Sequence, residues 1–132
     1  MNPNAPCPCG TTRPYDRCCG ALHARHAADG TLAAATPEAL MRSRYSAFVL
    51  DLRDYLLASW HASTRPATLE PPETGLKWLG LTVQSSALQD ADHGTVQFVA
   101  RSKLGGRAHR LQERSRFVRE HGAWFYVDGD LS

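Results

Sequence analysis

The 132-residue sequence has no long hydrophobic run and contains only four cysteines. No stretch approaches the roughly 18 consecutive apolar residues that a membrane-spanning helix needs, so we expect neither such a helix nor a membrane partner. Residues 1–6 contain neither a basic cluster nor an apolar run, so we expect no signal peptide. We therefore predict a cytoplasmic location. The formal net charge is only +2, which is too small to indicate a nucleic-acid-binding protein by itself.

The composition is typical of a soluble globular protein. Hydrophobic residues make up 42% of the chain and charged residues 21%. A length of 132 residues suits one ordinary domain with a small appendage.

All four cysteines lie within residues 7–19, in the pattern C-x-C-x8-C-C. Four thiols are the number that a tetrahedral structural metal site needs. Gly10 follows the first pair and can adopt a positive φ, which lets the chain fold back toward an ion. The second pair is vicinal and is expected to start a turn of helix. The spacing therefore predicts a metal site made of Cys7, Cys9, Cys18 and Cys19.

Two other interpretations of the cysteines remain open from the sequence. A disulfide between the adjacent Cys18 and Cys19 would be strained, but Cys7 or Cys9 could pair with either of them. A reactive dithiol is the second alternative. Cytoplasmic thiols stay reduced, and a compact four-cysteine cluster there is more often a metal site, so we favour metal binding.

The same stretch resembles a known module. The residues that carry the resemblance are Cys7-Pro8-Cys9-Gly10-Thr11, Tyr15 and Cys18-Cys19-Gly20. They are similar to the SEC-C motif, the zinc-binding module at the C-terminus of the SecA translocation motor, with Thr11 in place of the usual serine. The resemblance implies one structural Zn²⁺ held by the four cysteines, and iron is the alternative that four sulfur ligands admit. It also implies contact with a protein or ribosomal partner.

Residues 21–35 are rich in alanine and predict a linker or a weak helix. They would join the module, residues 1–20, to a domain over residues 36–132. His23 or His26 in this segment could replace one thiolate as a ligand. Because four sulfurs already complete a tetrahedron, we interpret the two histidines as solvated side chains.

Residues 36–60 predict two helices. The triplet Thr-Pro-Glu at residues 36–38 is a helix start, with a hydroxyl N-cap, a proline in the first turn and an acid behind it. Apolar residues then recur at helical spacing up to Val49. Asp51 is expected to cap a second helix, which ends near Trp60 and precedes a proline-rich loop.

The remaining residues predict four antiparallel strands. Alternating apolar residues between glycine-containing turns indicate strands over residues 76–88, around 96–100, over 107–119 and over 124–127. The run Asp128-Gly129-Asp130 is expected to end the last strand. Two helices followed by antiparallel strands indicate an α+β fold with the helices packed on one face of the sheet.

Most of the chain beyond residue 35 also resembles one family. The resemblance rests on six segments, which are residues 41–48, 54–57, 60–61, 63–66, 113–117 and 124–129. They are similar to the bacterial YchJ family. The resemblance implies a nuclear transport factor 2-like (cystatin-like) fold, in which a curved antiparallel sheet is packed on N-terminal helices. That fold occurs in enzymes and in binding domains, so it does not name an activity.

Glu113 is the strongest candidate for a functional side chain in the predicted sheet. It shares a strand face with Leu111 and Phe117, which are expected to point into the core, and a buried carboxylate must be paired or must line a cavity. One hypothesis is an ion pair with an arginine that joins helix to sheet. The alternative is a ligand pocket, in which a raised pKa of Glu113 could serve acid–base chemistry. The residues of this pocket would be Arg42, Arg44, His61, His109, Glu113 and Ser115.

These patterns favour a non-enzymatic binding or adaptor protein, since no nucleophile with an adjacent base can be read from the spacing. A small-molecule-binding or enzymatic pocket around Glu113 is the second hypothesis. A weaker third hypothesis is RNA binding through the strand face that carries Arg110, Arg114 and Arg116, which otherwise is a solvated surface.

Overall fold

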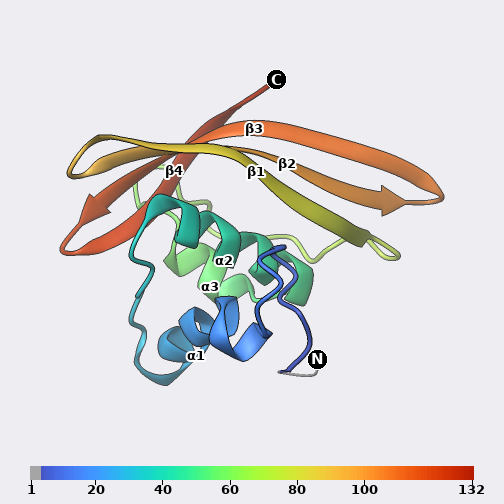
Figure 1. The fold of residues 1–132 in the computed structure, drawn as a ribbon, viewed down its shortest axis with the longest axis horizontal. Helices are drawn as coiled ribbons and strands as arrows, with labels where there is room; N and C mark the ends of the chain where they lie inside the picture. The colour runs from blue at the N-terminus through green and yellow to red at the C-terminus, as the bar shows by residue number, and fades with distance from the viewer. Residues whose placement is uncertain (1–3) are drawn as a thin grey trace.

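The computed structural model describes residues 4–132, which form an antiparallel sheet with the helices on one of its faces (Figure 1). The strands lie in the sheet in chain order, β1-β2-β3-β4, which confirms the predicted α+β fold. Among the described residues, no helix is long and apolar enough to cross a membrane. The elements are the 3-10 turn η1 (Tyr15–Arg17), α1 (Cys19–Asp29), α2 (Pro37–Leu50), α3 (Arg53–Ala58), β1 (Lys77–Asp90), β2 (His93–Leu104), β3 (Arg107–Glu120) and β4 (Ala123–Leu131).

Two expectations fall partly outside the described residues. The first is the zinc module predicted at residues 1–20, and the second is the absence of a signal peptide at the N-terminus. Both include residues 1–3, which lie outside the described residues.

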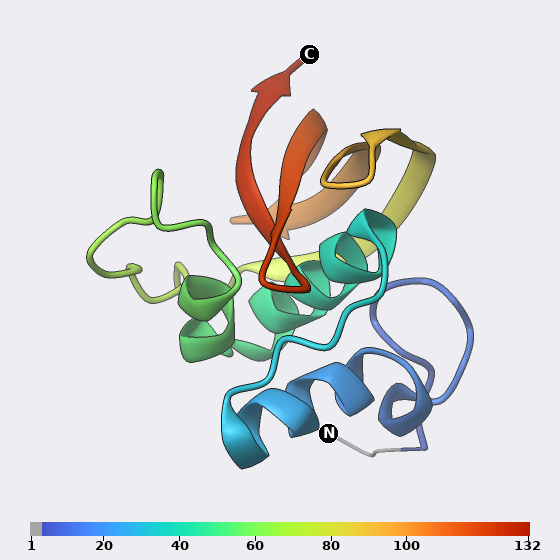
Figure 2. The ribbon, with the colours of Figure 1, turned by 90° about the vertical axis from the view of Figure 1, so that its left-hand side faces the viewer.

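Helix α2 is the element on which the sheet and the other helices pack. It begins as the sequence predicts, because Thr36 Oγ1 accepts a hydrogen bond from the Ala39 N–H at 3.0 Å and Pro37 occupies the first turn. The helix contacts β1, β2 and β4 as well as α1 and α3. Figure 2 shows α1 beneath α2, on the side away from the sheet.

The end of α2 corrects one prediction. Asp51 is the C-terminal cap of α2 instead of the N-cap of the next helix, and its φ of 57° is left-handed. Its N–H bonds back to the carbonyls of Ala47 and Phe48. A short polar side chain tolerates this conformation better than most non-glycine residues do. Helix α3 begins after Leu52, which provides no side-chain cap.

The segment at residues 21–35 contains most of α1, followed by an extended stretch. Its alanines favour a helix. Gly30 ends this helix with a φ of 80°, and its N–H bonds to the His26 carbonyl at 2.8 Å. Leu22 and Ala34 pack on the core at the two ends of the segment. The connection between module and domain is therefore packed against the core of the domain.

The sheet extends further than predicted at its C-terminal end. Strand β4 continues to Leu131 through the Asp128-Gly129-Asp130 run that is expected to end it. Arg116 of β3 holds the two aspartates, with its Nε 2.6 Å from Asp128 Oδ1 and its Nη1 2.7 Å from Asp130 Oδ2. These cross-strand ion pairs keep a run of turn-forming residues extended.

The core lies between α2 and the sheet, which arches over the helix (Figure 1). Val96, Phe98 and Ala100 alternate along β2 as predicted, and all three are buried. The other buried members of this cluster are Ala34, Leu40, Met41, Tyr45, Phe117 and Trp124.

Leu40 tests this assignment of the core. Its side chain is 0% exposed, whereas Leu79 of β1 is 56% exposed. We expect Leu40→Ala to lower the free energy of unfolding by about 2–5 kcal/mol, because it removes buried methyl groups and leaves a cavity. Leu79→Ala, the same change at the surface, should alter it by less than about 0.5 kcal/mol. Urea unfolding followed by tryptophan fluorescence measures both values, and equal losses would contradict the assignment.

Candidate metal centre

The four cysteine thiols converge on one point at the start of α1. Their sulfur atoms all lie within 4.8 Å of one another, and Cys9 Sγ is 3.5 Å from Cys18 Sγ. A tetrahedral ion with metal–sulfur bonds of about 2.3 Å separates its ligands by roughly 3.8 Å, so the cluster fits such an ion. All four cysteines are free thiols, which overturns the disulfide alternative. The cysteines are therefore positioned to bind a metal.

A tight turn carries the first cysteine pair. Gly10 has the positive φ that the sequence predicts, 89°, and its N–H bonds to the Cys7 carbonyl at 3.3 Å. A Cβ added at Gly10 would lie 3.2 Å from the Leu81 carbonyl oxygen of β1. The glycine therefore permits both the turn and the close approach of the module to the sheet.

The second cysteine pair opens α1, as predicted for a vicinal pair. Cys18 precedes the helix and Cys19 is its first residue. Tyr15 packs against the cysteine cluster. A Cβ added at Gly20 would lie 2.5 Å from the Tyr15 carbonyl oxygen, so only glycine fits beside this tyrosine.

His23 is buried, not solvated as predicted, and its ring nitrogens bind other partners. Its Nε2–H donates to the Ser43 carbonyl at 2.8 Å, which leaves Nδ1 to accept a hydrogen bond from the Tyr15 hydroxyl at 2.6 Å. Burial lowers the pKa of His23, so the ring is neutral. The His26 ring packs edge-on against Tyr55, with 5.4 Å between the ring centroids. The four sulfurs are thus positioned to bind a metal without a histidine.

The module is docked on the α+β domain through its cysteines. Cys7, Cys9 and Cys19 are 4%, 0% and 2% exposed. Cys7 Sγ lies 3.5 Å from Ser46 Oγ of α2, and Leu81 of β1 packs against the same cluster. The metal centre therefore lies at the boundary between module and domain.

The sulfur cluster needs a cation to hold several thiolates. A hydrogen bond from Cys19 lowers the pKa of Cys7, and the same bond raises the pKa of Cys19. The cluster therefore accepts one negative charge readily and resists a second until a metal ion neutralises it. At the partly exposed Cys18, Thr11 Oγ1 and Arg13 Nη2 lie 3.1 Å and 3.7 Å from the sulfur. Both groups lie within hydrogen-bonding distance of that sulfur.

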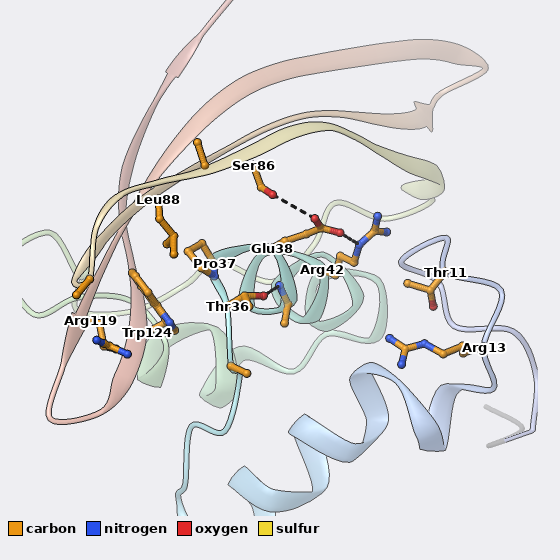
Figure 3. A pocket seen from close by; sticks show the side chains of 14 residues that line it. Thr11, Arg13, Thr36, Pro37, Glu38, Arg42, Ser86, Leu88, Arg119 and Trp124 are labelled. Atoms are coloured by element: carbon orange, nitrogen blue, oxygen red, sulfur yellow. Dashed lines mark hydrogen bonds and ion pairs between the residues drawn. The ribbon is translucent and has the colours of Figure 1, made fainter.

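A groove of about 670 Å³ runs along the module, the start of α2 and the edge of the sheet (Figure 3). Three arginines line it, Arg13, Arg42 and Arg119, together with one acid, Glu38. Arg119 also contacts Asp92, with 3.2 Å between its Nε and the Asp92 Oδ1. The lining of the groove is therefore basic on balance.

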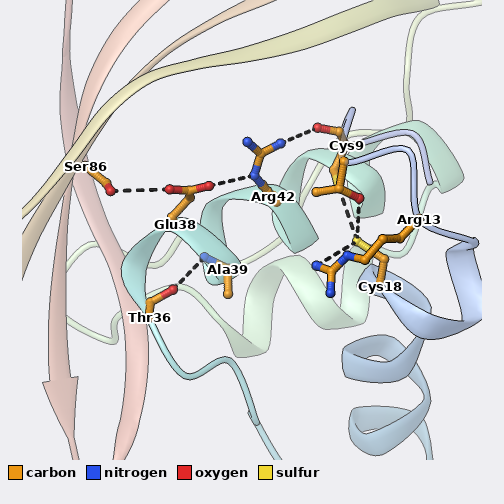
Figure 4. Close-up of polar contacts among 9 residues, drawn as sticks. Cys9, Arg13, Cys18, Thr36, Glu38, Ala39, Arg42 and Ser86 are labelled. Carbon is orange, nitrogen blue, oxygen red and sulfur yellow. Dashed lines mark hydrogen bonds and ion pairs between the residues drawn. The ribbon is translucent and has the colours of Figure 1, made fainter. Parts of the chain in front are cut away.

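Arg42 connects this groove to the metal centre (Figure 4). Its Nη1 donates to the Cys9 carbonyl at 2.7 Å, and its Nε donates to Glu38 Oε2 at 3.0 Å. Glu38 Oε1 in turn accepts a hydrogen bond from Ser86 Oγ of β1 at 3.3 Å. A continuous chain of polar contacts thus runs from the cysteine cluster across α2 to the sheet.

Three of the six predicted pocket residues come together around one cavity. Arg44, Glu113 and Ser115 line a space of about 200 Å³ between α2 and the sheet. Glu113 accepts a hydrogen bond from Ser115 Oγ. Arg44 is 5% exposed, and burial lowers its pKa to about 10, so it stays charged at neutral pH. Within residues 4–132, no carboxylate forms an ion pair with Arg44, so Glu113 lines the cavity without the predicted arginine pair.

The other three predicted pocket residues lie elsewhere. Arg42 faces the module, because residues two apart on a helix point about 200° apart and Arg44 faces the cavity. His61 Nε2 lies 2.9 Å from Glu120 Oε1. His109 is exposed on β3 near its hairpin with β2.

The predicted set contains none of the aromatic residues that line the cavity, and two of them, Trp60 and Tyr126, pack against Arg44. The Arg44 guanidinium carbon lies 5.0 Å from the Trp60 ring centroid and 4.7 Å from that of Tyr126. Within the described part of the chain, Trp60 Nε1 is buried without a hydrogen-bond partner. A β-bridge between residues 60 and 126 brings the two rings together. No local sequence pattern predicts this contact.

Two known families match this arrangement of module and domain. Residues 36–129 match the family described as "YchJ, middle NTF2-like domain", and residues 4–21 match the SEC-C motif. The chain belongs to the YchJ family. Both resemblances noted in the sequence are thereby confirmed.

Curated relatives and solved structures of similar length support this assignment. A UPF0225 protein of Methylibium petroleiphilum is 64% identical over 127 residues, which are 96% of this chain and 88% of the relative. A UPF0225 protein of Bordetella pertussis is 55% identical over 134 residues, 98% of this chain and 97% of the relative. The solution structure of a SEC-C motif containing protein from Rhodopseudomonas palustris has a TM-score of 0.79 at 34% identity, and the match covers 96% of this chain and 98% of that one. A crystal structure of a SEC-C motif containing protein from Psychrobacter arcticus has a TM-score of 0.76 at 25% identity, with 96% and 82% covered.

Cobalt binding tests the ligand set. We expect the metal-free chain to bind one Co²⁺ and to show the intense visible absorption of a tetrahedral four-thiolate site. Cys9→Ser removes a fully buried ligand, so this variant should lose that spectrum. Ser46→Ala, which changes a neighbour of Cys7 that is not a ligand, should keep it. The weak bands of octahedral Co²⁺, or an unchanged spectrum in Cys9→Ser, would contradict the site.

The buried His23 predicts a loss of stability in acid. Its pKa lies below the ordinary value of about 6.5, so below that pH the unfolded chain binds more protons than the folded chain, and folding becomes less favourable. The Tm of the metal-loaded protein should therefore fall between about pH 7 and pH 5. The fall should be smaller in His23→Gln, whose amide can still accept from Tyr15 and donate to the Ser43 carbonyl. Calorimetric curves with the same pH dependence in both proteins would rule out this role.

Proposed function

We propose that the protein is a non-enzymatic binding protein whose SEC-C module, held by one structural Zn²⁺, contacts an acidic surface of a protein or ribosomal partner. The position of the module carries this proposal. Its cysteines are packed on α2 and β1, while its arginines remain at the surface. The metal would thus present a basic surface in a fixed orientation on the domain.

Zinc is the ion that best suits the four sulfurs. Four thiolates complete its tetrahedron and leave no open position for water or substrate, so the ion would be structural. A module of this size cannot bury a core of its own, and metal binding contributes about 10–16 kcal/mol to the folding of small zinc modules. Iron is the alternative, and it would give the folded protein a visible sulfur-to-iron absorption that zinc lacks. In the reducing cytoplasm the thiols would stay available for the metal.

The exposed side of the module supports a partner of negative charge. Arg13 and Arg17 are both exposed beside Cys18. A zinc ion with four thiolates carries a formal charge of −2, but three of these thiolates are buried, whereas the two arginines lie at the surface. Arg42 and Arg119 also line the groove, where they are paired with Glu38 and Asp92, so among the described residues Arg13 and Arg17 provide the unpaired positive charge of this side. Complementary charge of this kind increases association rates and selects acidic partners.

Charge reversal at the module tests this function. We expect the tagged full-length chain to retain specific partners from an extract of its own bacterium, and Arg13→Glu combined with Arg17→Glu to reduce their recovery at least tenfold. The captured partners should also be released as salt rises, because exposed charge pairs are screened. Quantitative mass spectrometry and RNA sequencing of the bound fraction measure both effects.

A matched control variant distinguishes the effect of reversing charge on the module from the effect of changing the net charge of the protein. Arg107→Glu combined with Arg110→Glu makes the same charge change at exposed residues of β3, outside the groove. This variant should retain the partners that the module variant loses. Partner loss in the β3 variant alone would contradict the proposal and would favour RNA binding by that strand.

RNA binding through β3 has less support than partner binding through the module. Arg116 and Arg119 are already engaged with aspartates. Three exposed arginines of the strand remain, Arg107, Arg110 and Arg114. Ion pairing therefore weakens the phosphate-binding potential of this face.

The cavity beside Glu113 favours a second candidate function, which is the binding of a small molecule between α2 and the sheet. Its volume of about 200 Å³ and its buried charged residue distinguish it from an ordinary packing gap. This candidate does not depend on the metal centre.

A further inference from the structure

The cavity between α2 and the sheet has the size and the walls of a site for a small flat molecule. Its volume of about 200 Å³ exceeds the roughly 150 Å³ of an engineered cavity that holds benzene. Aromatic side chains from α2, β1, β2, β3 and β4 and from the second residue after α3 surround it. They are Tyr45, Phe48, Trp60, Trp78, Phe98, Phe117 and Tyr126.

Two side chains of opposite charge, Arg44 and Glu113, line the cavity among these aromatic residues. The buried Arg44 guanidinium lies beside the Trp60 and Tyr126 rings, and its Nη1 donates to the Leu56 carbonyl and to Ser59 Oγ, both at 2.7 Å. Neither of these partners carries charge. Glu113 is near enough to act electrostatically on Arg44, although the two form no ion pair. The cavity is therefore lined by a buried cation and by a carboxylate that is not paired with it.

We propose that this cavity binds a small, uncharged, planar molecule with a lactam edge, in which a carbonyl stands next to an N–H. The carbonyl oxygen would accept a hydrogen bond from Arg44, and the adjacent N–H would donate to Glu113. The flat body would lie between the aromatic side chains, where offset and edge-to-face contacts add to the burial of apolar surface. This inference rests on the second candidate function, small-molecule binding, and names its ligand class.

Charge balance selects a neutral ligand over a charged one. Arg44 and Glu113 together carry no net charge, so a bound carboxylate or ammonium would add an uncompensated charge to a mostly apolar space. Such a charge is costly to desolvate. A lactam satisfies a donor and an acceptor at the same time and brings no charge.

The entrance to the cavity lies between α2 and β3. Phe48 of α2 and Leu111 of β3 both line the cavity, and they are 41% and 40% exposed. On the neighbouring strand, Ala100 pairs with Leu111 and is 5% exposed. A small side chain at residue 100 thus keeps the inner end of the cavity open.

Titration with 2-quinolinone tests the ligand class on the metal-loaded full-length chain. Indole N–H signals in ¹H–¹⁵N spectra report the outcome, because Trp60 and Trp78 line the cavity and Trp124 lines the separate groove. We expect 2-quinolinone to shift the first two signals and to leave that of Trp124 in place. The matched probe 1-methyl-2-quinolinone lacks the N–H donor and should bind at least tenfold more weakly.

Two variants connect the binding to the cavity. Ala100→Leu fills the inner end and should abolish the shifts, whereas Ala108→Leu, the same change at an exposed residue of β3, should leave them unchanged. Glu113→Gln replaces a charged acceptor with a neutral one and should weaken binding roughly tenfold, since hydrogen bonds to charged groups are the stronger.

The result of the panel separates failure of the ligand class from failure of the site. Equal binding of both quinolinones, or binding of benzoate or benzamidine alone, would contradict the proposal that the ligand has a lactam edge. Either result would still support small-molecule binding in the cavity. No binding of any of these four probes would overturn both. Neither result bears on the zinc module, which lies on the other side of α2.

Discussion

The contact between the cysteine cluster and α2 is the interaction on which the rest of the structure depends. Arg42 bonds to the Cys9 carbonyl and to Glu38, and Cys7 lies against Ser46. A module of this size cannot bury a core of its own, so a bound metal would supply much of its folding energy. Metal binding and docking would then act together, since the cysteines that converge on one point are also buried against the helix.

Helix α2 lies between the basic groove and the aromatic cavity. Arg42 points to the metal module and the basic groove, and Arg44 points to the aromatic cavity under the sheet. Between them, the Ser43 carbonyl accepts a hydrogen bond from His23 of α1. Three consecutive residues of α2 thus contact three different places: Arg42 lines the groove, Ser43 bonds to α1 and Arg44 lines the cavity. A partner at the groove and a ligand in the cavity would both contact this rigid helix.

The module could be predicted from the sequence more completely than the cavity, and the reason is the distance along the chain. The four ligands lie within residues 7–19, so spacing, Gly10 and the vicinal pair restrict the geometry locally. The cavity depends on Trp60 reaching Tyr126, a contact that no periodicity describes. Hydrophobic patterning predicted helices α2 and α3 and the sheet. It did not predict that Asp51 ends α2, because a short polar side chain suits either end of a helix.

Hydrogen–deuterium exchange of the full-length chain, with and without its metal, tests the central claim most directly. The claim is that the metal centre fixes the module onto α2. Removal of the metal should then raise exchange in residues 5–29 and in α2, while β2 and β3 keep their protection, because the strand residue that packs against the cluster, Leu81, belongs to β1. Unchanged exchange in α1 and α2 after metal removal would contradict the account.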